Sequence, residues 1–259
     1  MRLDEEYCLS EYVDLGRLGD NEKVHIVRNQ VNGVIGVRKY VALDLEEIYL
    51  FLKENPNVYI PKIYECIQTD TNLIVIEEYL SGKNLEEMLK EKYFSEKDAA
   101  DIIICLCDAL YPLHHAKMPV ICRDLKAENV ILTNEGEVKL VDFDIARIYQ
   151  PGKSKDTVMM GTQGYAAPEQ FGFGQTDART DIYAMGVLLN YMLVREFPME
   201  KLTEGKFRTI VLKCIKINPE DRYQNVDEFK ADICNAAEIP CSSMDSDKNC
   251  LLYTSPSPR

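Results

Sequence analysis

Four polar residues between positions 124 and 142 have the types and the spacing to carry out chemistry. Asp124 is followed closely by Lys126 and Asn129, and a second acid, Asp142, comes shortly after them. One carboxylate can take a proton from a hydroxyl group, while an Asn and a second carboxylate can hold a metal ion. Together these groups are suited to phosphoryl transfer to a hydroxyl.

A short hairpin is expected to bring these residues together. The apolar run 130–132, a turn at 133–136 that contains Asn and Gly, and the alternating run 138–143 predict two strands that fold back on each other. This fold would return Asp142 to the side of Asn129.

The rest of the chain divides into a β-rich first part and a helical second part, which predicts an α+β fold of two lobes. β-rich runs and one amphipathic helix come first, at 24–27, 34–37, 44–54 (the helix), 62–66 and 72–76. Helices are expected after the Ser81-Gly82 step, over 84–92, 95–117, 180–195, 206–216 and 225–237. The expected boundaries are a first lobe at 1–79, a hinge at 78–82 and a second lobe at 83–239.

Charge and composition exclude several classes of function. A net charge of −13 argues against binding to nucleic acids or anionic membranes, because the average field repels phosphate. Nine cysteines without a CxxC pair, and only three histidines, make a zinc site unexpected and indicate reduced thiols. Without a signal peptide or an apolar run of transmembrane length, we expect a cytoplasmic protein with no membrane segment. The sequence carries no signal for an oligomeric state.

The last residues have a different composition. Residues 240–259 are rich in Ser and Pro without periodicity, so we expect them to be disordered. The final LLYTSPSPR resembles translated vector sequence, and we leave it out of the fold.

The run ICRDLKAENVILTNEGEVKLVDFD resembles the catalytic loop of protein kinases, H-R-D-L-K-x-x-N, followed by D-F-G. The resemblance implies one kinase domain over 1–239 that uses ATP with Mg²⁺, or Mn²⁺ in its place. In that family Asp124 accepts or orients the proton of the incoming hydroxyl, and Lys126 steadies the transferred phosphoryl group. Asn129 and Asp142 hold the metal against the phosphates.

Two residues depart from the family pattern. Cys122 replaces a His that normally packs beneath the D-F-G segment, and a small thiol can fill that position. Asp144 replaces a Gly, and Asp adopts left-handed backbone angles less readily than Gly.

Further segments support the resemblance. GTQGYAAPE at 161–169 is similar to the segment that closes a kinase activation loop, so Glu169 is expected to pair with Arg222 in the interior. Asp181, in TDIYAMG, is expected to bond the backbone of the catalytic loop. These three roles are structural.

The first lobe should bind the nucleotide. Comparison of GVRKYV with V-A-I-K identifies Lys39 as the phosphate-binding lysine. Glu46 and Glu47 could both pair with it, and we favour Glu47 because Leu50 and Phe51 would then follow on the same inward face.

The phosphate-covering loop matches its family pattern weakly. With G-x-G-x-x-G-x-V anchored on Val24, only Gly19 is in place, and Arg17 and Glu22 occupy the other glycine positions. A Glu there is expected to weaken or reshape ATP binding.

The run IVIEEYLSGKNL at 74–85 resembles the segment that holds adenine. Backbone groups near Glu78 and Leu80 would bond the base, and Asn84 would reach the ribose. Glu77 would screen the back of the pocket, and a buried carboxylate there needs a partner that the sequence does not name.

Two cues indicate serine/threonine specificity, Lys126 two residues after Asp124 and Thr162 before the A-P-E segment. Arg123 is associated with kinases regulated through the activation loop. A phosphate on Thr157 could pair with Arg123 and Arg147, although an ordinary polar loop explains Thr157 equally well.

Three functions therefore compete. The first is an active protein serine/threonine kinase acting on protein substrates. The second is a pseudokinase or nucleotide-sensing scaffold, suggested by the missing glycines and by Glu77, Cys122 and Asp144. The third, a small-molecule kinase, is disfavoured by Lys126 and the A-P-E segment.

Overall fold

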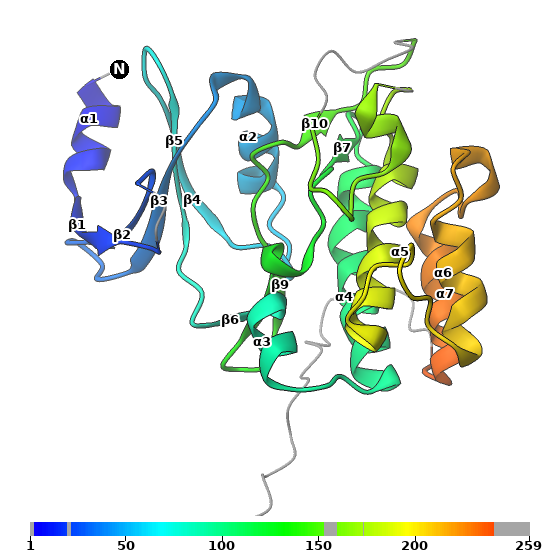
Figure 1. Cartoon of the computed structure of the whole chain (residues 1–259). Helices are drawn as coiled ribbons and strands as arrows, with labels where there is room; N and C mark the ends of the chain where they lie inside the picture. Colours follow the sequence, from blue (N-terminus) through cyan, green and yellow to red (C-terminus); the bar gives the residue numbers. More distant parts are fainter. Residues whose placement is uncertain (1–2, 20–21, 153–159, 173, 241–259) are drawn as a thin grey trace, which may run out of the picture. The chain divides into compact units, whose positions relative to one another are not determined.

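The protein is described by a computed structural model that covers residues 3–19, 22–152, 160–172 and 174–240 (Figure 1). The chain forms two compact units, Met1–Ser81 and Gly82–Arg259, which we call the β-rich unit and the helical unit. The boundary falls inside the segment 78–82. The content of the two units confirms the predicted α+β fold class.

The β-rich unit is built around an antiparallel sheet of five strands in the order β1-β2-β3-β5-β4. Its elements are α1 (Leu3–Ser10), β1 (Tyr12–Arg17), β2 (Val24–Asn29), β3 (Ile35–Val41), η1 (Leu43–Leu45), α2 (Glu46–Glu54), β4 (Ile63–Gln68) and β5 (Leu73–Glu78). The sequence did not predict α1 or β1. A bulge between Asp14 and Gly16 interrupts the alternation in β1, whose residues are mostly exposed.

The helix α2 turns a different face inward from the one expected. Its buried residues are Ile48, Tyr49 and Leu52, whereas Leu50 is 40% exposed. The expected inward face at Leu50 and Phe51 is therefore wrong. The apolar residues four apart, 48 and 52, define the buried stripe, as the helical period requires.

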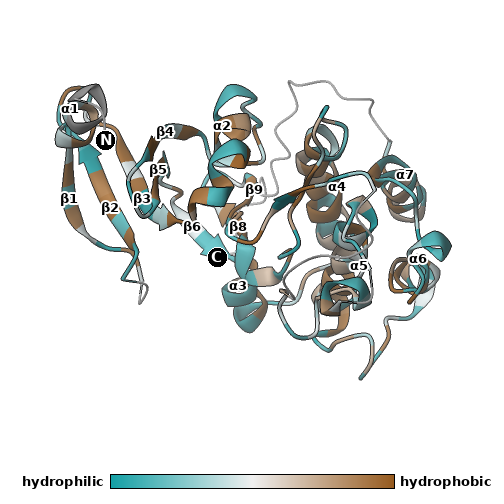
Figure 2. Ribbon diagram, turned by 90° about the horizontal axis from the view of Figure 1, so that it is seen from above, coloured by the Kyte–Doolittle hydropathy of each residue, from teal (hydrophilic) through white to brown (hydrophobic). Residues whose placement is uncertain are grey.

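The helical unit contains the larger core. Its longer helices are α3 (Leu85–Glu91), α4 (Glu96–His114), α5 (Ala178–Val194), α6 (Arg208–Cys214) and α7 (Val226–Ala237). Its strands are β6 (Gly82–Asn84), β7 (Val120–Ile121), β8 (Val130–Thr133), β9 (Val138–Leu140) and β10 (Arg147–Ile148). Short 3-10 turns complete it: η2 (Ala127–Asn129), η3 (Pro168–Phe171), η4 (Gly205–Phe207) and η5 (Pro219–Asp221). Hydrophobic residues run along α4 and α5, which pack against each other (Figure 2).

The start of α4 follows directly from the sequence. Ser95 accepts a hydrogen bond from the backbone N–H of Asp98, whose carboxylate accepts one from the N–H of Ser95 in return. This capping box satisfies two N–H groups that the helix cannot bond internally, and it confirms the predicted helix start.

A membrane-spanning helix and the C-terminal tail were the subjects of two expectations from the sequence. Among the described residues, none of the helices combines the length and the apolar character that crossing a membrane requires. The predicted disordered tail, 240–259, lies outside the described residues from position 241 onward.

Candidate active site

The predicted hairpin that carries Asp142 is confirmed. β8 and β9 are antiparallel, with Val130 opposite Leu140, and Gly136 in the turn has a φ of 85°, which favours glycine. The N–H of Val141 donates a 2.9 Å hydrogen bond to the carbonyl of Asn129. The hairpin thus returns the chain to Asn129 one residue before Asp142.

Asp124 accepts hydrogen bonds from three side chains. Lys126 Nζ lies 2.7 Å from Oδ2, and Asn129 Nδ2 donates to the same oxygen at 3.0 Å. The Thr162 hydroxyl donates to Oδ1 at 2.6 Å and lies 3.1 Å from Lys126 Nζ. The carboxylate is thereby fixed in orientation while its side chain remains 12% exposed.

Asn129 and Asp142 suit a divalent metal ion that also binds phosphates. The buried Asn129 donates through Nδ2 to both the carbonyl and the carboxylate of Asp124, which leaves its amide oxygen as the potential ligand. The described residues contain no cluster of three or more His, Cys, Asp or Glu placed for a metal. Mg²⁺ does not need one, because it commonly uses one or two protein oxygens together with substrate phosphates and water.

The left-handed residue in this segment is Asp142, not Asp144. Asp142 has a φ of 68°, and its Oδ1 accepts a 3.1 Å hydrogen bond from the N–H of Asp144. Asp144 is not among the residues with positive φ, so this conformation does not require a glycine at position 144.

Asp181 holds the backbone of the catalytic loop, as expected. Its fully buried carboxylate accepts hydrogen bonds from the N–H groups of Cys122 and Arg123, at 3.0 and 2.9 Å. His114 Nε2 lies 2.8 Å from Oδ2. These contacts hold Arg123 at a φ of 64°, a conformation that costs free energy for a residue with a side chain.

Cys122 contributes through its main chain. Burial raises the pKa of its thiol well above the ordinary value, so the side chain stays neutral. The N–H group bonded to Asp181 belongs to the main chain, so this contact does not depend on the side chain at position 122.

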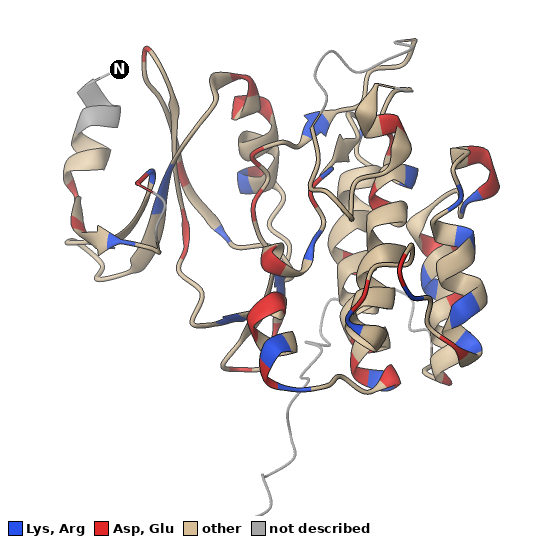
Figure 3. Cartoon of the chain, viewed as in Figure 1, with Lys and Arg blue, Asp and Glu red and all other residues tan. Residues whose placement is uncertain are grey.

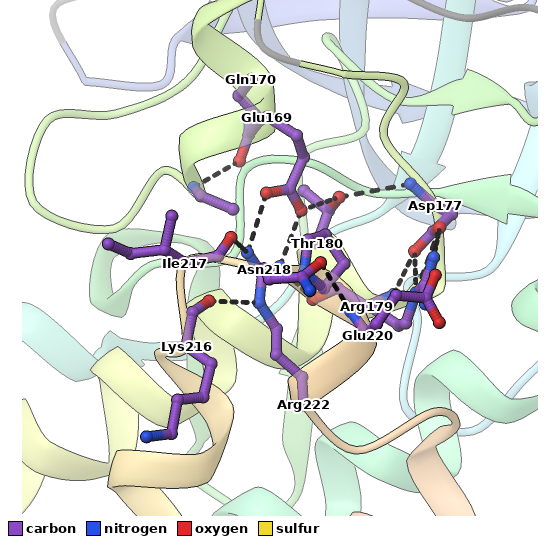
Figure 4. A network of polar contacts seen from close by, with 12 residues as sticks. Glu169, Gln170, Asp177, Arg179, Thr180, Lys216, Ile217, Asn218, Glu220 and Arg222 are labelled. Carbon is purple, nitrogen blue, oxygen red and sulfur yellow. Dashed lines mark hydrogen bonds and ion pairs between the residues drawn. The ribbon is translucent and has the colours of Figure 1, made fainter.

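Glu169 and Arg222 form the expected interior ion pair (Figure 4). The guanidinium donates to both carboxylate oxygens, at 2.7 and 2.9 Å, and also to the carbonyl oxygens of Lys216 and Ile217. Thr180 adds a 2.8 Å hydrogen bond to Glu169. This network ties η3, the start of α5 and the segment before η5 together.

Lys39 has a different carboxylate partner from the one predicted. Its Nζ lies 2.6 Å from Oε1 of Glu77, on the neighbouring strand β5, whereas Glu47 is exposed on α2. The proposed pair with Glu47 is therefore wrong in this structure, because the inward stripe of α2 is formed by apolar residues. The structure also supplies the partner that the buried Glu77 was expected to need.

Gly19 lies shortly after the end of β1, and Val24 is the first residue of β2. Gly19 is exposed with a φ of 68°, and the N–H of Leu18 donates to the carbonyl of Val24 at 2.9 Å. The two residues that replace family glycines form an exposed ion pair with each other, with Arg17 Nη1 3.3 Å from Glu22 Oε1. This pair joins the last residue of β1 to a residue two positions before β2.

Two of the residues expected to contact adenosine, Glu78 and Asn84, also form hydrogen bonds within the protein. Glu78 donates its N–H to the carbonyl of Lys62 at 2.9 Å, and Leu80 is partly exposed. Asn84 is the N-cap of α3, where its Oδ1 accepts a 2.8 Å hydrogen bond from the N–H of Glu87. A ribose contact from Asn84 would therefore fall to its amide nitrogen.

Arg123 contacts the segment 145–148, which contains Arg147. Arg123 Nε donates to the carbonyl of Ile145 at 2.7 Å, and β10, which includes Arg147, pairs with β7. Burial, followed by the positive charge of Arg123, lowers the pKa of Arg147. Thr157 lies outside the described residues.

The sequence interpretation missed two contributors to this site. Gln170 donates to the carbonyl oxygens of Arg123 and Met160, and so connects the catalytic loop to the activation segment. His114 reaches Asp181 from the end of α4. Gln170 directly follows Glu169, and His114 stands beside His115 at the end of an apolar run, so local composition did not single out either residue.

Comparison with known proteins agrees with this geometry. The family described as "Protein kinase domain" matches residues 32–248. The probable serine/threonine-protein kinase PknB of Corynebacterium glutamicum is 32% identical over 192 residues, 61% of this chain and 29% of that protein. The serine/threonine-protein kinase PknB of Mycobacterium leprae is 27% identical over 292 residues, 94% and 47% of the two chains.

Animal proteins are also related. Rabbit protein kinase C zeta type is 29% identical over 224 residues, 78% of this chain and 37% of that protein. The chain spans less than half the length of each of these relatives. Since the family match extends over most of the described residues of both units, the chain belongs to the protein kinase domain family.

Proposed function

We propose that this chain is the catalytic domain of an ATP-dependent protein serine/threonine kinase. The observation that carries the proposal is the orientation of Asp124 by Lys126, Asn129 and Thr162. Relatives that are named serine/threonine-protein kinases point to the same reaction.

The proposed reaction is in-line transfer of the γ-phosphoryl group of ATP to a Ser or Thr hydroxyl. Asp124 accepts or orients the proton of the incoming hydroxyl. Lys126, 2.7 Å from Asp124, is close enough to stabilise the negative charge of the transferred group. Thr162 keeps the second carboxylate oxygen in place.

Residues proposed to bind the nucleotide or its metal occur in each unit, taken by itself. In the β-rich unit these are Lys39, Gly19, Val24, Glu78 and Leu80; in the helical unit they are Asn84, Asn129 and Asp142. A bound Mg²⁺ or Mn²⁺ would neutralise charge on the phosphates. Magnesium fits the oxygen donors of Asn129 and Asp142, because it prefers hard oxygen ligands.

Regulation through the activation segment is supported by the position of the two arginines. Arg123 and Arg147 repel each other, so a doubly charged phosphate would relieve that repulsion. Phosphorylated Thr157 is the proposed source of this phosphate.

The substrate is a protein, and the net charge of −13 disfavours nucleic acid. We propose that this domain acts in the cytoplasm, because the proposed reaction consumes ATP and the cytoplasm supplies it.

Transfer of labelled γ-phosphate tests the proposal. With Mg²⁺, the wild type should label a generic protein substrate or itself, and acid hydrolysis should recover the label on phosphoserine or phosphothreonine. Label on phosphotyrosine only, or on a sugar or an aminoglycoside but not on protein, would contradict it.

A scaffold without transfer is the second candidate. It is favoured by the exposed Arg17–Glu22 pair, which stands where the family has glycines. Nucleotide binding with no Asp124-dependent transfer would support this alternative.

A further inference from the structure

Lys39 and Glu77 are placed together by the register of the sheet. Val37 lies opposite Glu77 and Lys39 lies opposite Val75, so the two charged residues occupy diagonal positions on one face. Long side chains bridge this diagonal readily. Figure 3 shows the basic segment of β3 beside the acidic end of β5.

Both charged groups are largely withdrawn from water. The side chain of Lys39 is 13% exposed and that of Glu77 is 9% exposed, with 2.6 Å between Nζ and Oε1. On the two neighbouring strands, Glu77 lies opposite Val37 and Ile63, and both of these side chains are uncharged. Removing Lys39 would leave the buried Glu77 carboxylate without this ion pair, which is strongly unfavourable.

The helix α2 does not supply this carboxylate. Its buried residues are Ile48, Tyr49 and Leu52. Glu47 is exposed and Glu46 is half-buried, and the carboxylate that contacts Lys39 is that of Glu77. A carboxylate on a helix moves whenever the helix moves relative to the sheet. A carboxylate on β5 is fixed to β3 by the backbone hydrogen bonds of two adjacent strands.

We propose that Glu77 is the positioning residue for Lys39, and that it replaces a carboxylate from α2 in this role. The proposal rests on the proposed function of Lys39 as a phosphate-binding residue. An ammonium group has three N–H donors, so the bond to Glu77 orients it without using its full capacity. The orientation of Lys39 is then set within the sheet and does not depend on α2.

A double-mutant cycle on nucleotide affinity tests this role in the full chain. Mg²⁺·ATP binding is measured by calorimetry for the wild type, Glu77→Gln, Lys39→Met and the double variant. Each single variant should lose about tenfold in affinity, and the double variant should bind no more weakly than Lys39→Met alone. Additive losses, or a change below about twofold for Glu77→Gln, would overturn the proposal.

Three glutamates on α2 provide the comparison. The exposed Glu54, at the end of the helix, is the matched control, and Glu54→Gln should bind like the wild type. Glu46→Gln and Glu47→Gln should also change the affinity by less than about twofold. A loss of about tenfold in either of them, with Glu77→Gln unaffected, would assign the role to α2 and contradict the proposal.

A second variant and a measurement of phosphate transfer complete the test. If Glu77→Gln fails to fold by circular dichroism, Glu77→Asp retains the charge on a shorter side chain and should still weaken binding at least about threefold. A wild type that shows the predicted cycle but transfers no phosphate contradicts only the proposed function. A wild type that binds no Mg²⁺·ATP contradicts both.

Discussion

The hydroxyl of Thr162 donates a 2.6 Å hydrogen bond to Oδ1 of Asp124, and the same hydroxyl lies 3.1 Å from Nζ of Lys126. Thr162 belongs to the segment before η3, whereas Asp124 and Lys126 precede η2. One hydroxyl therefore connects the activation segment to both proposed catalytic side chains. The orientation of Asp124 depends on how that segment is placed.

Replacing Thr162 by Val tests this connection. Valine has nearly the shape of threonine but cannot donate, so Asp124 Oδ1 loses its 2.6 Å partner. We expect the kcat for a peptide substrate to fall about tenfold or more, with the KM for ATP changed less than about twofold. Steady-state kinetics with both substrates varied provides the measurement.

Thr162→Ser is the matched control, because it keeps the hydroxyl. It should retain most of the kcat of the wild type. Equal losses in Thr162→Ser and Thr162→Val would show that the methyl group and its packing matter, and the hydrogen bond does not.

The Arg222–Glu169 pair should stabilise the helical unit strongly. The guanidinium of Arg222 is fully buried, and Glu169 would lose both of its 2.7–2.9 Å contacts with it. Arg222→Met should therefore lower the free energy of unfolding by about 3–5 kcal/mol, measured by urea denaturation.

An exposed ion pair in the same unit serves as the control for that measurement. Lys83 and Glu91 lie 2.5 Å apart, with side chains 53% and 60% exposed. Lys83→Met should change the free energy of unfolding by less than about 1 kcal/mol. Similar losses for Lys83→Met and Arg222→Met would disprove the special role of burial.

Glu22 should weaken the binding of ATP through its charge. It stands at a family glycine position, is exposed and is only partly neutralised by Arg17 at 3.3 Å. Glu22→Gln should raise the affinity for Mg²⁺·ATP roughly two- to fivefold at low salt, and about 0.5 M NaCl should reduce the difference. Calorimetric titration at two salt concentrations measures it.

Neutralising a carboxylate elsewhere in the β-rich unit should not raise the affinity for Mg²⁺·ATP. Asp70 is exposed in the turn between β4 and β5, and Asp70→Asn should leave the affinity unchanged. An equal gain in both variants would indicate a general field effect. A loss of affinity in Glu22→Gln would contradict the prediction.

Cys66 should react slowly with alkylating agents at neutral pH. Burial, aided by nearby carboxylates, raises the pKa of its thiol on β4 to about 11. Only the thiolate is nucleophilic, so the rate of modification by iodoacetamide should still be rising at pH 10. Peptide mass spectrometry measures the rate, and a plateau below pH 9 would contradict this prediction.

The same shift has a consequence for stability. The thiol has a higher pKa in the folded chain than in the unfolded chain, so the folded state favours the protonated form. Its contribution to stability is present below the unfolded pKa of about 9 and is lost as the pH rises toward about 11. Cys66→Ala should reduce the loss of stability over that interval.

Much of the fold was predictable because local signals agree with the tertiary structure. Ser95 and Asp98 form a capping box that needs only their spacing, and the hairpin before Asp142 needs only its turn residues and alternation. The pairing of Glu169 with Arg222 required the family resemblance, because no local rule connects residues so far apart.

The partner of Lys39 was not predictable in the same way. Which carboxylate meets it depends on the register of β3 against β5 and on which stripe of α2 faces inward. A shift of one residue would place Glu77 on the other face of the sheet. Glu46 and Glu47 are adjacent acids at the start of a short helix, and their spacing alone could not decide between inward and outward positions.

The most direct test of the account is phosphoryl transfer by Asp124→Asn, measured together with nucleotide binding. Asparagine keeps the size of the side chain but cannot accept the proton of the substrate hydroxyl. We predict that the variant binds Mg²⁺·ATP as the wild type does and transfers the γ-phosphoryl group to a protein substrate at least about a hundredfold more slowly. Transfer at the rate of the wild type by Asp124→Asn would contradict the proposed role of Asp124.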